Sequence, residues 1–289
     1  MRVSLLTPRR GVLRGAAALV LGSAVLPLAA ACGSPAGQKT GGTSSSAAAA
    51  GEPIAPSSGN YSPPASSPQA ALTAPYTATA PSLKGAVDSS WSKAQKYTIS
   101  ANSATLQAVG KVWPSPPMQT STVSLLWDAK NLYVGEVRVQ TSAGLPANFQ
   151  PAQPNNMYLG NSLGVFVANT DFGTASYTED GHYTVWGGPT GGNGAPEIWL
   201  RAGDSSTSTE DDTYPTWPIS IKTNATGYVM TLSMPWSAFQ AVPWTVGKGA
   251  AVAFTFLATA AGSSGSPWGQ IMLVGSGDTP NTWGVLTLK

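Results

Sequence analysis

The chain has 289 residues, of which 42% are hydrophobic and only 10% are charged, with 32 glycines and 24 prolines. Such a chain is apolar enough to bury a core, and its glycine and proline content favours strands and turns over long helices. Its lysines and arginines form no cluster, which excludes the basic face of a nucleic-acid-binding protein.

The first 32 residues have the pattern of a secretion signal. A basic start is followed by an apolar run from residue 16 to residue 31 and by small residues before Cys32. The apolar run is too short and too small-sided to predict a membrane span. The pair Arg9-Arg10 resembles the twin-arginine export motif, and the general secretory route remains an alternative.

Cys32 is the only cysteine, so a disulfide within the chain and a cysteine-rich metal site are both excluded. Its place after "LPLAAA" resembles the lipobox of bacterial lipoproteins, although Ala29 stands where leucine is usual. We therefore expect a lipid on Cys32 and an extracytoplasmic protein, anchored to the membrane by that lipid or secreted. Removing residues 1–31 takes away four arginines and no acid, which changes the formal net charge of +2 to about −2.

Residues 33–75 are dominated by serine, alanine, glycine and proline and carry no apolar period, which predicts a disordered tether. From Tyr76 onward, tryptophans and β-branched residues recur in short runs between turn residues. This pattern predicts one all-β domain over 76–289, a single antiparallel β-sandwich, which we expect to be monomeric.

Period-two alternation predicts strands in this domain. In residues 250–260 both alternating faces are apolar or small, which is typical of a central strand. Pro235 is placed to begin one helical turn. The predicted strands are 97–102, 122–127, 132–140, 162–169, 182–186, 197–201, 217–222, 227–234, 250–260, 271–274 and 283–288.

A hairpin is predicted over residues 121–139. Val123, Leu125 and Trp127 share one face, and the four residues "DAKN" at 128–131 form the connection. We expect the side chains of Asp128 and Asn131 to bond the backbone of the turn.

Five motifs in order resemble the family 9 carbohydrate-binding modules and the wider group of extracellular sugar- and haem-binding β-sandwiches. They are "AVDSSW" at 86–91, "LLWDAKNLYVGEVRV" at 125–139, "LGNSLGVFVANTD" at 159–171, "GYVMTLSMPWSAF" at 227–239 and "NTWGVLTLK" at 281–289. The resemblance implies a jelly-roll-like sandwich that binds a sugar terminus between two aromatic rings. It also implies a carbohydrate partner and a non-catalytic role in carbohydrate catabolism.

Carried over position by position, the resemblance puts one clamping ring at Tyr158 and the other at Trp268, with Trp283 as the alternative. The family's Asp-Ser-x-Glu motif falls on Asn161 and Gly164, so both of its carboxylates are absent.

Further ligand contacts are predicted from chemistry, because sugars stack their apolar faces on aromatic rings while polar side chains recognise their hydroxyls. Trp186 and Trp199 are expected at loop edges as additional stacking rings. Asn156, Asn161, Arg201 and Gln270 are the expected polar contacts. Trp91, Trp127, Trp236 and Trp283 are expected in the core.

An enzyme is not expected. His182 is the only histidine, and no Gly-x-Ser-x-Gly nucleophile elbow is present. Glu136, Glu179 and Glu197 remain open as a glycosidase acid pair, because sequence does not give the distance between carboxylates.

No cofactor is expected, but two alternatives stay open. The acidic run 206–213 could hold Ca²⁺ through its carboxylates, although a solvated loop is the simpler interpretation. A haem or electron-transfer module would need His182 with Met157, Met230 or Met272 as axial ligands. A third function, a scaffold subunit of an extracytoplasmic complex, would use the aromatic residues against a protein partner.

Overall fold

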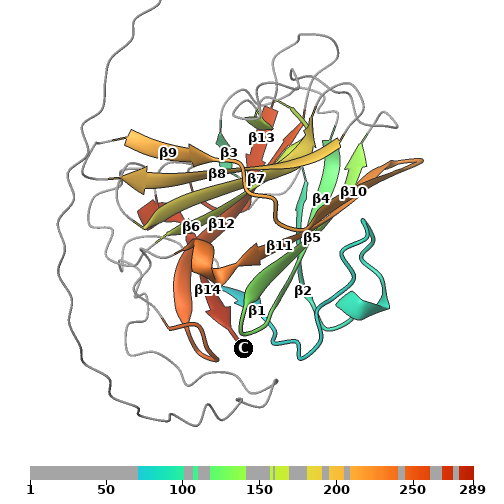
Figure 1. The fold of residues 1–289 in the computed structure, drawn as a ribbon. Coiled ribbons are helices and arrows are strands. Elements are labelled where there is room, and N and C mark those ends of the chain that lie inside the picture. The colour runs from blue at the N-terminus through green and yellow to red at the C-terminus, as the bar shows by residue number, and fades with distance from the viewer. Residues whose placement is uncertain are drawn as a thin grey trace, which may run out of the picture. The chain divides into compact units, whose positions relative to one another are not determined.

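The structure is a computed structural model, and it describes residues 71–100, 107–109, 118–140, 157–158, 160–168, 181–190, 195–204, 209–239, 245–260, 269–275 and 280–289. These residues form two β-sheets that pack face to face as a sandwich (Figure 1). None of the helices in these ranges has the length and hydrophobicity needed to cross a membrane. The predicted signal, the tether as far as residue 70 and Cys32 lie outside the described residues.

The larger sheet is antiparallel except at one edge, where β1 pairs with β14 in parallel. Its strands, in spatial order, are β1 (Ala71–Ala74), β14 (Gly284–Leu288), β12 (Ala251–Ala260), β6 (Ser162–Ala168), β7 (His182–Thr190), β8 (Ala195–Asp204) and β9 (Thr209–Thr213). Two short strands extend it beside β12, namely β13 (Gly269–Met272) and β3 (Gln107–Val109).

The smaller sheet is entirely antiparallel. Its strands, in spatial order, are β10 (Ile219–Asn224), β11 (Gly227–Pro235), β5 (Asn131–Gln140), β4 (Met118–Trp127) and β2 (Gln95–Ser100). Three single turns of 3-10 helix complete the described elements: η1 (Ser89–Trp91), η3 (Trp236–Ala238) and η4 (Pro280–Thr282). The turn predicted at Pro235 is confirmed, since this proline caps η3.

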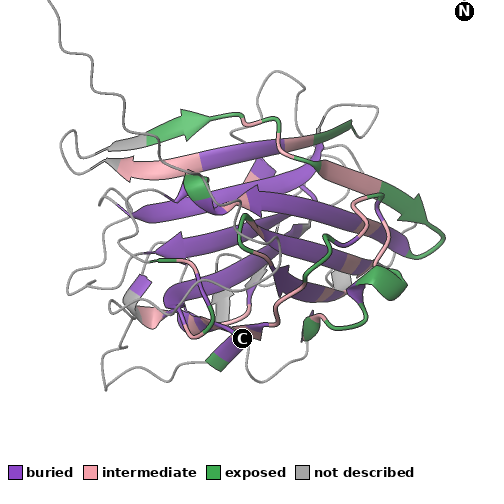
Figure 2. Ribbon diagram, turned by 60° about the horizontal axis from the view of Figure 1, so that its bottom comes forward, coloured by how far each residue is buried: buried purple, intermediate pink, exposed green. Residues whose placement is uncertain are grey.

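The main core fills the space between the two sheets, and period-two alternation selects its members. In β12, Val252, Phe254 and Phe256 point into this core, while Ala253 and Leu257 point to the other side of the sheet and are also buried. The prediction of a central strand with two apolar faces is therefore confirmed. Exposed residues gather at the sheet edges, as Figure 2 shows.

The predicted hairpin is β4–β5, with Val123, Leu125 and Trp127 completely buried. Asp128 Oδ1 accepts hydrogen bonds from the backbone N–H groups of Lys130 and Asn131, each at 2.7 Å. The connection is three residues rather than four, because Asn131 already belongs to β5. Its side chain donates to the Tyr133 hydroxyl at 3.3 Å and not to the turn backbone, so that part of the prediction was wrong.

All of the predicted strands are present, with ends shifted by a few residues, but three strands were missed. These are β1, β3 and β9. The predicted domain boundary at Tyr76 is too late, because β1 lies inside the range assigned to the tether. Four core tryptophans were predicted correctly: the exposed fraction is 1% for Trp91, 0% for Trp127, 7% for Trp236 and 0% for Trp283.

β1 belongs to the larger sheet and also forms hydrogen bonds to the smaller sheet. Leu72 and Ala74 of β1 are buried in the main core. The Tyr97 hydroxyl of β2 donates to Thr73 O at 3.0 Å and accepts from Thr73 N at 2.6 Å. Lys289 N donates to Ala74 O at 2.9 Å. The first described strand of the domain is thus bonded to both the smaller sheet and the C-terminus.

Candidate functional site

The outer face of the larger sheet carries a second apolar cluster, called here the outer-face cluster. The outer face of a sandwich is commonly polar and solvated, so a buried aromatic face there needs an explanation. Its members come from β6, β7, β8, β12, β13 and the segments before β6 and β14: Met157, Phe166, Ala168, Trp186, Trp199, Ala253, Leu257, Met272 and Trp283, with Tyr158 and Val285 partly buried against them.

The rings of this cluster form a row across neighbouring strands. The ring centroids are 5.5 Å apart between Trp283 and Phe166, 5.8 Å between Phe166 and Trp186, and 6.4 Å between Trp186 and Trp199. The last two indoles are stacked, with an interplanar angle of 21°. Tyr158 lies 6.4 Å from Trp186 and 6.3 Å from Trp199, and it is the ring of this group that remains partly exposed.

Trp186 and Trp199 are not at loop edges, so this expectation was wrong. Trp186 lies in the middle of β7, which continues through Gly187 and Gly188, and Trp199 lies in the middle of β8. Their exposed fractions are 5% and 3%. The two indoles therefore pack against the Tyr158 ring and leave little of their own ring surface exposed to a ligand.

Gly164 explains why the carboxylate implied by the resemblance is absent from β6. A Cβ atom at this position would lie 2.9 Å from Phe166 Cε2 and 3.0 Å from two carbons of the Trp186 indole. Both distances are shorter than packed carbon atoms adopt, so any side chain here would displace the stacked indole. Trp186 thus occupies the space that a glutamate at residue 164 would need.

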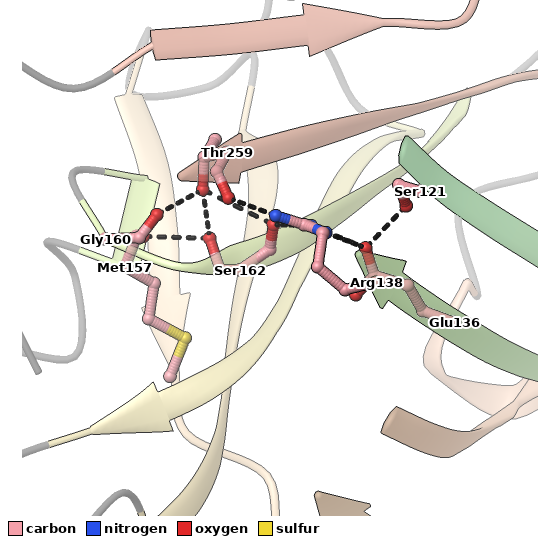
Figure 3. A network of polar contacts seen from close by, with 7 residues as sticks. All are labelled: Ser121, Glu136, Arg138, Met157, Gly160, Ser162 and Thr259. Atoms are coloured by element: carbon pink, nitrogen blue, oxygen red, sulfur yellow. Dashed lines mark hydrogen bonds and ion pairs between the residues drawn. The ribbon is translucent and has the colours of Figure 1, made fainter. Parts of the chain in front are cut away.

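The turn before β6, which carries Tyr158, is fixed by a buried polar network (Figure 3). Ser162 Oγ donates to Met157 O at 2.8 Å, and Thr259 Oγ1 donates to Gly160 O at 2.6 Å. The hydroxyls of Ser162 and Thr259 are themselves 2.7 Å apart. These bonds hold both ends of the segment that includes Asn161, whose side chain is completely buried.

Arg138 of β5 links this network to the smaller sheet. It donates from Nη1 to Thr259 O at 2.7 Å and from Nη2 to Ser162 O at 3.1 Å, both on the larger sheet. Nε donates to Glu136 Oε1 at 2.8 Å, and Ser121 Oγ donates to the same oxygen at 2.6 Å. Arg138 and Glu136 are completely buried. Burial lowers the pKa of Arg138, but the interactions of Arg138 with Glu136 and Tyr228 together outweigh this effect, and the net change is upward.

A polar group lies at the end of the aromatic row, next to Trp199. The guanidinium carbon of Arg201 is 4.9 Å from the centroid of the Trp199 ring. Trp199 Nε1 donates to Asp212 Oδ1 at 3.0 Å, and Arg201 Nε is 3.5 Å from the same oxygen. The side chains of Arg201 and Asp212 are 32% and 39% exposed. Asp212 was not among the predicted site residues.

The structure brings together four of the predicted site residues, Tyr158, Trp186, Trp199 and Arg201. Trp268 and Asn156 lie outside the described residues, as does the side chain of Gln270, whose backbone pairs with Thr259 and Val109. Their predicted roles as ligand contacts stay predictions.

The alternative chemistries are partly constrained. The acidic run 206–213 is not simply a loop, because Thr209–Thr213 is edge strand β9, on which neighbouring side chains point to opposite faces. No cluster of three or more metal-ligating side chains is found in the described ranges. Glu136 was proposed as a glycosidase acid, but it is buried and paired with Arg138.

The axial pair His182 and Met230 is excluded. Met230 faces the main core, whereas the ring of His182 lies 5.3 Å from Trp283 of the outer-face cluster. Met157 and Met272 belong to the same outer-face cluster as Trp283, so both lie on the same side of the larger sheet as His182. The pairs His182–Met157 and His182–Met272 therefore stay open as alternatives.

Residues 83–289 match the model of one protein family, described as "Carbohydrate family 9 binding domain-like". No curated protein matches the chain. A solved family 9 carbohydrate-binding module from Caldicellulosiruptor kristjanssonii, in complex with cellotriose, superimposes with a TM-score of 0.52 at 16% identity, covering 76% of this chain and 94% of that one. The same kind of module in complex with glucose gives a TM-score of 0.47 at 16% identity, with 76% and 96% coverage. A Bacteroides uniformis protein gives 0.50 at 11% identity, with 76% and 100% coverage.

Proposed function

We propose that this chain, which belongs to the carbohydrate family 9 binding domain-like family, binds a glycan without catalysis by stacking a sugar on Tyr158. The observation that carries the proposal is the partly exposed Tyr158 ring seated on two buried, stacked indoles. The cellotriose complex of the Caldicellulosiruptor module, whose fold this chain shares, supports a carbohydrate as the ligand.

The physical basis of such binding is a flat ring held rigid before the ligand arrives. A tyrosine ring against the C–H face of a sugar buries apolar surface, and a ring already fixed by its neighbours loses little freedom on binding. Trp186 and Trp199 supply this support from the strands beneath. Because one exposed ring buries little area, the expected affinity is weak to moderate.

The predicted lipid on Cys32 and the tether that follows it suit this role. A domain held by a long Ser/Ala/Gly/Pro-rich segment can search the space above a membrane for a polymer that does not diffuse. We therefore propose an extracytoplasmic lipoprotein that captures glycan at the cell surface.

Affinity electrophoresis through gels containing soluble glucans, followed by calorimetric titration with cellotriose and a glycan array, tests the proposal. Tyr158→Ala is expected to weaken binding at least about tenfold, which corresponds to ~1.4 kcal/mol. Tyr76→Ala is the matched control, because this tyrosine is likewise partly buried against a tryptophan, Trp127, but packs on the main core and not on the outer-face cluster. Absence of binding to any glycan, or equal loss in both variants, would contradict the proposal, and release of new reducing ends would contradict its non-catalytic part.

A further inference from the structure

The open rim of the outer-face cluster is polar. Trp199 lies deep in β8 with 3% of its surface exposed, while Arg201 and Asp212 beside it keep about a third or more of their side chains in solvent. A ligand that rests on Tyr158 and extends past Trp199 would therefore reach this pair of charges.

The pair is held in place by the sheet. Arg201 of β8 and Asp212 of β9 are direct partners in the antiparallel register. Asp212 Oδ1 accepts from Trp199 Nε1 at 3.0 Å and lies 3.5 Å from Arg201 Nε. The Arg201 guanidinium in turn rests over the Trp199 ring at 4.9 Å. Three contacts thus orient the carboxylate and the guanidinium on one indole, so ordering them costs little when a ligand binds.

A carboxylate next to a guanidinium matches the chemistry of a sugar diol. The carboxylate accepts from hydroxyl groups, and the guanidinium donates to hydroxyl oxygens. Hydrogen bonds to charged groups are the stronger class, and beside an apolar ring they give specificity to a stacking contact that by itself accepts many sugars.

β6 supplies no such carboxylate, because the Trp186 indole fills the space above Gly164. Along the outer face, β6 is followed by β7, β8 and β9. Asp212 therefore lies three strands away from residue 164, or roughly 14 Å at ordinary strand spacing. Asp212 is thus at the edge of the sheet, whereas residue 164 is in its interior.

We propose that Asp212, oriented by Trp199 and paired with Arg201, is the carboxylate that recognises sugar hydroxyls in this protein. The inference rests on the proposed function, because it assigns the polar half of the same site. Tyr158 and the guanidinium of Arg201 both contact the Trp199 indole, so one bound saccharide can touch the stacking ring and the charged pair together. The position at the sheet edge suits a saccharide of more than one unit, which can extend beyond β9.

The test is calorimetric titration of the full-length protein with cellotriose, and with whichever array saccharide binds the unmodified protein most tightly. Asp212→Asn keeps an oxygen that can accept from Trp199 Nε1 but removes the charge, and it is expected to weaken binding at least about tenfold. Asp211→Asn is the matched control, since it removes the same charge from the adjacent residue, which is also exposed but lies on the opposite face of β9. Arg201→Gln provides a second variant, with a loss of similar size expected.

The outcomes separate the two proposals. If the unmodified protein binds and the affinity of Asp212→Asn is unchanged, or falls no more than that of Asp211→Asn, the role of Asp212 is overturned while the function stands. If the unmodified protein binds no saccharide, both are overturned. Thermal unfolding of each variant shows whether it is folded, and should Asp212→Asn be unfolded, the affinity of Arg201→Gln decides by the same criterion.

Discussion

Arg138 is the residue on which the buried polar contacts between the two sheets converge. Replacing it with methionine leaves the Glu136 carboxylate buried beside Ser121 with no cation. Breaking a buried pair in this way costs about 3–5 kcal/mol, whereas replacing both partners by apolar residues costs far less. Arg138→Met is therefore expected to lose more unfolding free energy than the double variant Glu136→Met/Arg138→Met in urea denaturation. An equal or larger loss in the double variant would contradict this account of the pair.

A substitution at Gly164 tests whether the stacking of Trp186 on Trp199 requires a residue without a side chain at this position. Gly164→Ala places a methyl group 3.0 Å from the Trp186 ring, and the resulting overpacking is expected to cost about 1–3 kcal/mol. Gly187→Ala is the control on the other face of the same sheet, where the new methyl meets the tips of Ile219 and Met230 at 3.3 Å. Denaturation should rank Gly164→Ala as the more damaging change, and only this variant should alter the near-ultraviolet circular dichroism of the indole pair.

The buried hydroxyl of Tyr228 is expected to make the stability of the folded protein decrease at alkaline pH. Burial raises the pKa of its hydroxyl well above 10, despite the opposing effect of Arg138. In the unfolded chain this tyrosine ionises near pH 10, so above that pH the folded state holds a proton that the unfolded state has lost. The stability it contributes is present below about pH 10 and falls by ~1.4 kcal/mol per pH unit above it.

Denaturation of the protein and of Tyr228→Phe between about pH 9 and about pH 11 measures this effect. The phenylalanine variant keeps the ring beneath Arg138 and removes a buried hydroxyl that has no hydrogen-bond partner in the described part of the chain. Its stability should decline less steeply with pH, and parallel curves for the two proteins would rule out the tyrosine as the cause.

At the scale of elements, β1 is expected to contribute to stability although it lies outside the range matched by the family model. Deleting residues 1–75 removes buried Leu72 and the ladder with β14, a loss of about 2–4 kcal/mol on the scale of one buried leucine and several hydrogen bonds. Deleting residues 1–70 keeps β1 and serves as the control. Equal melting temperatures for the two truncations would show that β1 contributes nothing.

The strands that could be predicted from sequence are those with a strong period of two and clear turn residues, such as β4, β5 and β12. β1 was missed because "ALTA" is too short to show a period and follows a Ser/Pro-rich segment, and its pairing partner is more than two hundred residues away. β9 was missed because "TEDDT" is rich in residues that strands disfavour. Both are edge strands, whose formation depends on a neighbour and not on their own composition.

The candidate site also divides into residues that could be selected from the sequence and residues whose placement depends on neighbouring strands. Tyr158 could be chosen from its motif position and Arg201 from its residue type beside an aromatic, and both lie at the outer-face cluster. The burial of Trp186 depends on the absence of a side chain at Gly164 in the next strand, and Asp212 is oriented by a cross-strand partner. Such relations exist only in the folded sheet. One signal in the sequence pointed to Asp212. It lies in an acidic run, and period-two alternation along that run would have placed neighbouring acids on opposite faces of a strand.

At the scale of the whole molecule, the predicted anchor gives a direct experiment. Cys32→Ser removes the only thiol and with it the expected site of acylation. The unmodified protein should incorporate labelled fatty acid and sediment with membranes, while the variant should do neither. Labelling of the variant, or an unlabelled parent protein, would contradict the lipoprotein proposal without affecting the sugar site.

The acidic edge strand β9 also has a consequence for possible contacts between copies of the protein. An unpaired strand edge is a template on which a second molecule can add its own edge. β9 carries Glu210, Asp211 and Asp212 in succession, so two such edges brought together would place like charges opposite each other. We therefore expect this edge to disfavour edge-to-edge pairing of two copies.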